Sequence, residues 1–217
     1  MSVEADRDIA RVPFAVWDYW GMVTDPLAAF RSSDDSSAAR LERDPEAGGY
    51  RRRKGFRSAA VLLLEEAAAA GQWHDRDPLV WPALYSFRHY VELELKYLIR
   101  EFPELGLGVP VATHRLRKLW PSVAEGFARC FGNEDREPFD VLERAIAMLE
   151  ALDPAGDGFR YAATRAGESS MIEDVYLAPQ ALLRLIREVD EVLGAAGMAF
   201  QAEAEVIQEM LENGYDS

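Results

Sequence analysis

The segment from residue 78 to residue 102 constrains the fold more than any other part of the chain. It reads PLVWPALYSFRHYVELELKYLIREF, and its apolar residues recur at the 3.6-residue period of an α-helix. They fall on two faces of that helix: Leu84, Phe87, Val91, Leu95 and Leu98 on one, and Tyr90, Leu93 and Tyr97 on the other. A helix that is apolar on two sides is normally surrounded by other elements. The segment therefore predicts the central helix of a bundle, with Leu95 buried between helices.

Further helical signals lie on both sides of this segment. Residues 56–70 are rich in alanine and leucine, which are the strongest helix formers. Thr113 is a good N-cap for a helix that starts at His114. Apolar residues recur at helical spacing over 134–152 and again from Pro179 onward.

The remaining stretches are shorter or irregular. A short aromatic-rich helix is expected over residues 13–30, and an acidic helix over 198–213, after a break at Gly194 and Gly197. Residues 159–173 lack a helical period, which predicts an irregular loop or one small β-hairpin. No alternation of strand and helix patterns is found. The sequence predicts an all-α fold, an antiparallel bundle of five to seven helices.

Composition divides the chain into three parts. Residues 1–54 combine an aromatic segment with a polar linker, because residues 31–54 are rich in serine, aspartate and glycine. Residues 55–197 carry the helical bundle, and residues 198–217 form an acidic C-terminal helix or tail.

Charge is distributed unevenly over 217 residues with a net charge of −14. Residues 51–130 carry a net charge of +4, whereas residues 131–217 carry −13. This balance argues against sequence-blind nucleic-acid binding by the whole surface. The single cysteine excludes an intramolecular disulfide. Since no apolar run approaches the ~18 residues of a membrane span, a cytoplasmic protein without a membrane partner is expected.

A polar stripe follows one side of the predicted central helix. His89, Glu92 and Lys96 lie one turn apart, with Tyr85 before them and Arg100 after them. One interpretation is an intrahelical network in which Glu92 pairs with both cations. The other is a polar cleft in which His89 and Glu92 are catalytic and Lys96 holds an anion. The sequence leaves both open.

A second basic cluster begins at the next predicted helix. His114 is followed by Arg115, Arg117 and Lys118. A histidine at a helix start can meet an anion, since the amide donors and the helix dipole point the same way. The alternative is an exposed helix start without a ligand.

A third candidate is Arg160, which stands between Phe159 and Tyr161. An arginine between two aromatic residues outside a helix either enters a cleft or anchors a loop. The three histidines show no HxxxH spacing and there is no CxxC pair, so the sequence predicts no metal and no cofactor.

The motif residues resemble those of bacterial HEPN-like helical proteins. In these, a helix that reads roughly His-x-x-Glu-x-x-x-Lys precedes a helix that begins His-x-Leu-x-x-Leu. Here His89, Glu92 and Lys96 match the first pattern, and the segment from His114 to Leu119 matches the second. The usual Arg-x(4-6)-His pair of the active members is not present in this chain.

The resemblance implies a helical bundle, often dimeric, in bacterial defence, stress-response or toxin–antitoxin systems. Many such proteins are metal-independent ribonucleases, and others bind RNA or protein partners without catalysis. The first hypothesis is thus an RNA- or nucleotide-facing cleft with catalytic His89, Glu92 and His114. Its phosphate-binding residues are Arg88, Lys96, Arg115 and Arg160. The alternative is a non-catalytic interaction or dimerisation subunit, whose partner is a second copy or another protein.

Overall fold

The computed structural model describes residues 41, 44–108, 112–132, 137–154, 156, 158–163, 166–167, 169 and 174–214. The chain divides into two units, Met1–Arg43 and Asp44–Ser217, and all elements described below belong to the second. The short helix expected over residues 13–30 lies outside the described residues.

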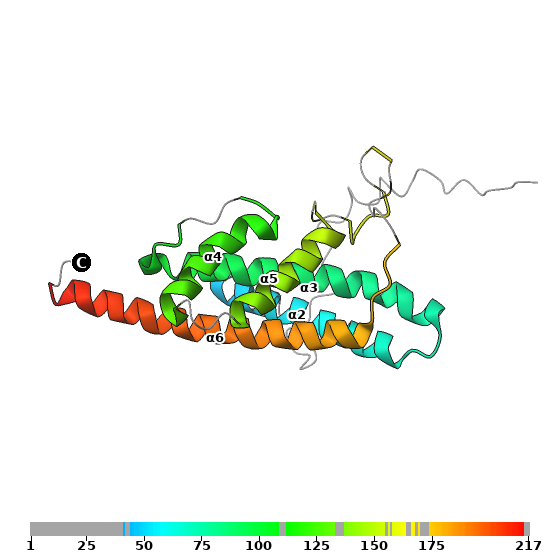
Figure 1. Ribbon diagram of the computed structural model, residues 1–217, viewed down its shortest axis with the longest axis horizontal. Coiled ribbons are helices and arrows are strands. Elements are labelled where there is room, and N and C mark those ends of the chain that lie inside the picture. The colour runs from blue at the N-terminus through cyan, green and yellow to red at the C-terminus, as the bar shows by residue number, and fades with distance from the viewer. Residues whose placement is uncertain are drawn as a thin grey trace, which may run out of the picture. The chain divides into compact units, whose positions relative to one another are not determined.

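Over the described ranges the protein consists of five α-helices and one 3-10 helix (Figure 1). These are α2 (Pro45–Ala69), α3 (Trp73–Glu101), η2 (Pro103–Leu105), α4 (Leu116–Phe131), α5 (Glu137–Leu152) and α6 (Pro179–Glu212). The predicted all-α helical bundle is confirmed.

The helix α3 is the central element, as the sequence predicts. It forms a hairpin with α2 and also contacts α4 and α6. The long helix α6 runs beside the α2–α3 hairpin and packs against α4 and α5 (Figure 1). Phe87, Val91 and Leu95 are completely buried between these helices.

An aromatic cluster joins α4 and α6 to the end of α3. The Phe200 ring of α6 lies 5.8 Å from the rings of both Phe102 and Phe127. Gly126 of α4 makes this contact possible, because a Cβ at that position would lie 2.5 Å from the Phe200 ring. The glycine is thus required by close packing and not by its backbone conformation.

The helix α2 begins earlier than expected. Residues 45–54 were expected in a polar linker, and this prediction is wrong, because they form the first turns of α2. Asp44 caps the helix by accepting a hydrogen bond from the Ala47 amide at 2.7 Å. Arg53 is then fixed by Glu94 of α3, with Nε 3.0 Å from Oε1. The cap and this long-range pair offset the low helix propensity of the glycines.

Two other boundaries differ from the sequence predictions. The helix α4 begins at Leu116 instead of His114, and Thr113 accepts a hydrogen bond from the Arg115 amide at 3.1 Å just before it. Gly194 and Gly197 do not interrupt α6, which continues to Glu212. Burial of α6 side chains after Gly197 outweighs the weak helix propensity of the two glycines.

Of the two alternatives for residues 159–173, an irregular loop or a small β-hairpin, the hairpin is not confirmed by the described residues. A single isolated antiparallel bridge joins Ala163 and Ser169, and the described residues there form no strand.

Candidate functional site

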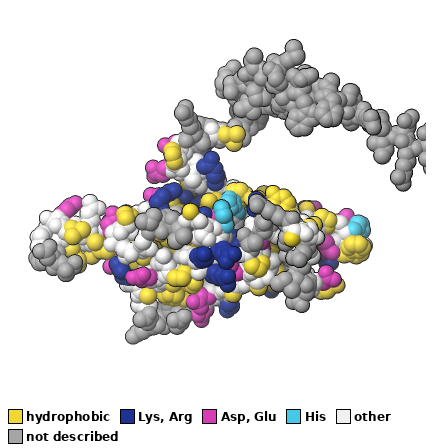
Figure 2. Space-filling view, turned by 90° about the horizontal axis from the view of Figure 1, so that it is seen from above, with side chains coloured by type: hydrophobic (Ala, Val, Ile, Leu, Met, Phe, Trp, Pro, Cys, Tyr) yellow, Lys and Arg dark blue, Asp and Glu magenta, His cyan; other side chains and the backbone are white. Residues whose placement is uncertain are grey.

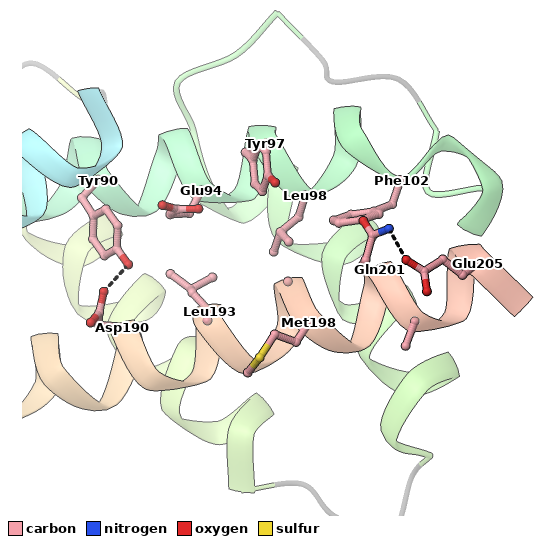
Figure 3. A pocket seen from close by; sticks show the side chains of 13 residues that line it. Tyr90, Glu94, Tyr97, Leu98, Phe102, Asp190, Leu193, Met198, Gln201 and Glu205 are labelled. Atoms are coloured by element: carbon pink, nitrogen blue, oxygen red, sulfur yellow. Dashed lines mark hydrogen bonds between the residues drawn. The ribbon is translucent and has the colours of Figure 1, made fainter. Parts of the chain in front are cut away.

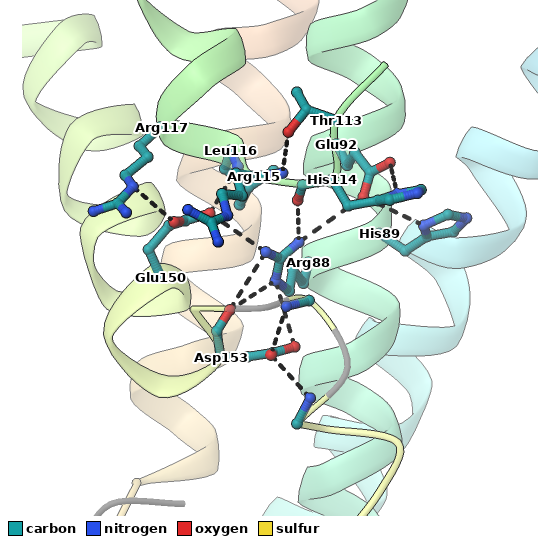
Figure 4. A network of polar contacts seen from close by, with 12 residues as sticks. Arg88, His89, Glu92, Thr113, His114, Arg115, Leu116, Arg117, Glu150 and Asp153 are labelled. Carbon is teal, nitrogen blue, oxygen red and sulfur yellow. Dashed lines mark hydrogen bonds and ion pairs between the residues drawn. The ribbon is translucent and has the colours of Figure 1, made fainter. Parts of the chain in front are cut away.

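Glu92 is the centre of a polar cluster between α3 and the start of α4 (Figure 4). Its side chain is only 5% exposed, yet its Oε1 lies 2.7 Å from Lys96 Nζ and 2.9 Å from His114 Nδ1. Its Oε2 lies 4.0 Å from His89 Nδ1. The structure therefore brings His89, Glu92, Lys96 and His114 together, across a sequence separation of 22 residues between Glu92 and His114.

The ionisation of Glu92 follows from these neighbours. Burial raises the pKa of the carboxyl group, but hydrogen bonds and positive charge from Lys96 and His114 outweigh burial. The pKa of Glu92 consequently lies below its ordinary value, and the group is a carboxylate at neutral pH.

His114 is oriented by this carboxylate and remains open to solvent. Its side chain is 75% exposed, and its Nδ1 is the nitrogen next to Glu92. A carboxylate beside Nδ1 favours the tautomer that carries the proton there. Proton exchange with a ligand would then use Nε2, as in an acid–base histidine whose Nδ1 is held by a carboxylate.

His89 has a less polar environment. Its ring makes an edge contact with Phe56 at 4.4 Å and lies parallel to Tyr85 at 5.9 Å. Burial, together with nearby positive charge, lowers the pKa of His89 below 6.5, although Glu92 opposes this shift. The imidazole is therefore mainly neutral at neutral pH, as a general base needs to be.

Arg88 does not fit its predicted role as a phosphate ligand. Its side chain is only 3% exposed. Nη1 donates to the main-chain oxygen of His114 at 3.0 Å, and Nη2 donates to Glu150 Oε1 at 3.3 Å. Nε lies 3.5 Å from Asp153 Oδ2. The guanidinium is enclosed by these groups, so Arg88 positions His114 instead of binding a ligand.

Glu150 and Asp153 are the residues that sequence reasoning missed. Glu150 of α5 accepts a hydrogen bond from the Leu116 amide at 2.7 Å and thereby caps α4. Asp153 accepts from the amides of Gly156 and Gly158 at 2.8 and 2.9 Å. The anion expected at the start of the His114 helix is thus a carboxylate of this chain itself. The one sequence signal for Glu150 was its position next to the apolar face of the helix predicted over residues 134–152.

The remaining basic residues stay on the surface. Arg115 is exposed beside His114. Arg160 is also exposed, with its guanidinium 5.6 Å from the centre of the Tyr85 ring, and its Nη2 donates to Gly156 O at 3.3 Å. Arg160 also contributes to the lowered pKa of His89, and it therefore lies on the same side of the bundle as the cluster.

A separate groove between α3 and α6 has the opposite character (Figure 3). Tyr90 donates a hydrogen bond to Asp190 there at 2.8 Å, and Glu94 and Glu205 also line it. Burial raises the pKa of Glu94. An acidic lining of this kind does not suit a phosphate group, so this groove is not the site of an anionic substrate.

The described residues show no metal site and no membrane-spanning helix. Among them, no group of three histidine, cysteine, aspartate or glutamate side chains could hold a metal ion. Within the same ranges, no helix is both long and apolar enough to cross a bilayer.

Comparison with family models, with curated proteins and with solved structures found no match for the chain.

Proposed function

We propose that the protein is an RNA-binding, HEPN-like helical protein of bacterial defence or stress response that cleaves RNA without a metal ion. The observation that carries this proposal is the pair of imidazoles on one carboxylate. His114 is hydrogen-bonded through Nδ1 to Glu92, and His89 lies beside the same carboxylate. Two histidines at one point of the surface supply a general base and a general acid.

The proposed reaction uses the 2′-hydroxyl of RNA as the nucleophile. Neutral His89 takes the hydroxyl proton, and the 2′-oxygen attacks the adjacent phosphorus. The bond from phosphorus to the 5′-oxygen breaks, and protonated His114 gives its Nε2 proton to that oxygen. The products are a 2′,3′-cyclic phosphate and a free 5′-hydroxyl, so the reaction needs no other reactant.

Positive charge around the histidines supports binding of the phosphate. Lys96 is partly exposed and lies beside Glu92, while Arg115 and Arg160 are on the surface nearby. Charge-assisted hydrogen bonds from such groups stabilise the charge that develops on the phosphate oxygens.

The test is cleavage of a labelled RNA by the purified protein in the presence of EDTA. We expect a cyclic-phosphate product, no cleavage of the 2′-deoxy analogue, and a loss of about 100-fold or more in His114→Ala and His89→Ala. The matched control is His74→Ala, because His74 is an exposed histidine in the first turn of α3, where it contacts Asp75 and the Trp73 ring. Equal activity in the His114 and His74 variants, or its abolition by EDTA, would contradict the proposal.

A second candidate function is a non-catalytic interaction subunit of a defence or toxin–antitoxin complex. It is favoured by the C-terminal half of α6, where four large apolar side chains are exposed. These are Met198, Val206, Met210 and Leu211. Under this alternative the protein forms a homodimer or binds another protein through α6, and substitution of Met210 and Leu211 by serine changes the mass measured by light scattering.

A further inference from the structure

We propose that the aromatic groove at the N-terminal half of α3 is a nucleobase-binding subsite that leads unpaired bases of an RNA strand to the His89–Glu92–His114 cluster. This inference rests on the proposed function, because it names the form of RNA that the site takes. It concerns residues that play no part in the acid–base chemistry.

The groove is large and lined by aromatic side chains. Its volume is about 860 Å³, within the range of ligand sites in proteins. Trp73 and Trp81 are 67% and 43% exposed, and Tyr176 is 96% exposed. Aromatic side chains exposed together in one groove mark a binding surface.

A series of side-chain contacts connects the groove to the histidine cluster. Trp81, Tyr85 and His89 lie one turn apart on α3, so Trp81 and His89 are about 12 Å apart along the helix axis. The Trp81 ring contacts Phe159 at 6.5 Å. Arg160, the next residue, lies over Tyr85, and Tyr85 is stacked with His89 at an interplanar angle of 6°.

The exposed aromatic rings of the groove indicate the ligand class. Bases of a single strand stack on aromatic rings, while arginine and lysine side chains follow its phosphates. Arg76 lines the groove but is paired with Asp77, and Asp174 also lines it, so the groove itself suits a base and not a phosphate. The cation for the adjacent phosphate is Arg160, which lies over Tyr85. Hydrophobic, basic and histidine side chains meet on one face of the molecule (Figure 2).

Duplex RNA cannot make the same stacking contacts with this groove. Its bases are stacked on one another, and proteins read it through backbone and 2′-hydroxyl contacts. The aromatic rings would then have no base faces to contact. We therefore expect an unpaired strand as the ligand, and not a helix of equal length.

The experiment measures binding of a fluorescein-labelled oligouridylate of about 15 nucleotides by anisotropy, with a duplex of equal length as the comparison. Three single substitutions are tested in the full chain: Trp81→Ala, Trp73→Ala and Tyr176→Ala. Since one lost stack weakens binding by about 5-fold or more, each variant should raise Kd for the single strand by that factor. Tyr50→Ala is the control, because Tyr50 is an exposed aromatic residue of α2 that lines a different pocket.

The outcomes separate this inference from the proposed function. Single-strand binding that weakens in the groove variants supports the subsite even if no cleavage product forms. Cleavage that depends on His114 but is unchanged in the groove variants overturns the subsite alone. Equal or tighter binding of the duplex also overturns it. A groove variant that changes the sedimentation coefficient without changing RNA binding assigns the groove to a contact between copies of the chain, and overturns the inference.

Discussion

At the scale of single residues, the site is organised by two buried charged side chains with different tasks. Glu92 faces groups that reach solvent, namely Lys96 and His114, whereas Arg88 faces groups that are themselves largely enclosed, Glu150 and Asp153. The contacts of Glu92 leave Lys96 and His114 accessible to a ligand. The contacts of Arg88 fix the backbone around the site. Substitutions at Arg88 and Lys96 therefore separate stability from binding.

Arg88→Gln should destabilise the protein, while Lys96→Gln should not. Removal of one partner of a buried ionic network costs roughly 3–5 kcal/mol, because the remaining charges lose their compensation. Lys96 is partly exposed, so water replaces it, and its loss is expected to change unfolding free energy by about 1 kcal/mol or less. Urea unfolding of both variants measures the difference. An Arg88→Gln variant as stable as wild type would contradict the positioning role of Arg88. In RNA binding, Lys96→Gln should lower the slope of log affinity against log salt concentration by about one phosphate contact.

Glu92→Gln should change the pH dependence of stability in a defined window. The pKa of Glu92 in the folded protein is lower than its ordinary value of 4.5, because Lys96 and His114 favour the carboxylate. Its contribution is therefore fully present above pH 4.5 and is lost as the pH falls through the lower folded value. We expect wild type to exceed Glu92→Gln in unfolding free energy at pH 7, and the difference to shrink below pH 4.5. Parallel curves over pH 3–7 would show that the carboxylate makes no such contribution.

At the scale of elements, the central position of α3 depends on side chains packed from all sides. Leu95 is completely buried among the helices. Leu95→Ala should lower the free energy of unfolding by ~2–5 kcal/mol through lost burial and the cavity that remains. A thermal melt detects this loss of stability as a lower melting temperature. An unchanged melting temperature would contradict the central position of α3. The exposed Leu62→Ala on α2 is the control, with little expected effect.

The contact between α4 and α6 gives a second prediction, with two glycines as a matched pair. Gly126→Ala places a Cβ 2.5 Å from the Phe200 ring, and the overpacked contact should cost about 1–3 kcal/mol despite the better helix propensity of alanine. Gly194→Ala in α6 meets no atom within 4 Å. It should stabilise the protein by about 0.5–1 kcal/mol. Denaturant midpoints that rise in both variants would show that α4 and α6 do not approach this closely.

At the scale of the folded unit, α6 connects the two ends of the bundle. It contacts α2, α3, α4 and α5, and its part beyond Gly197 contributes the buried side chains of Phe200 and Ala204. The acidic C-terminal segment is thus part of the core on one side, and only its exposed side is open to a partner.

A chain that ends at Gly197 should consequently be much less stable than the full chain. Loss of Phe200 alone removes ring contacts with Phe102 and Phe127 and is expected to cost about 3–5 kcal/mol. A chain that ends at Gly214 keeps all of α6 and serves as the control. Circular dichroism melts compare the two, and equal melting temperatures would mean that residues 198–212 are a separate appendage.

The all-α class, the central helix and the proximity of His89, Glu92 and Lys96 could all be predicted from the amino-acid sequence. These are consequences of helical periodicity, which is a local property of the chain. Helix ends were less predictable, because the start of α2 depends on a contact between Arg53 and Glu94, 41 residues apart. Propensity alone assigned those residues to a linker.

Which charged residues are open to a ligand depends on contacts between helices and could not be predicted from the sequence. Arg88 meets Glu150 and Asp153 across 62 and 65 residues, and that pairing encloses it. His114 was recognisable as a candidate, but its hydrogen bond with Glu92 arises from packing of the α4 entry against α3. The groove formed by Trp73, Trp81 and Tyr176 likewise joins two segments distant in sequence. Such pairings depend on how helices pack, and the periodicity of one helix carries no information about its neighbours.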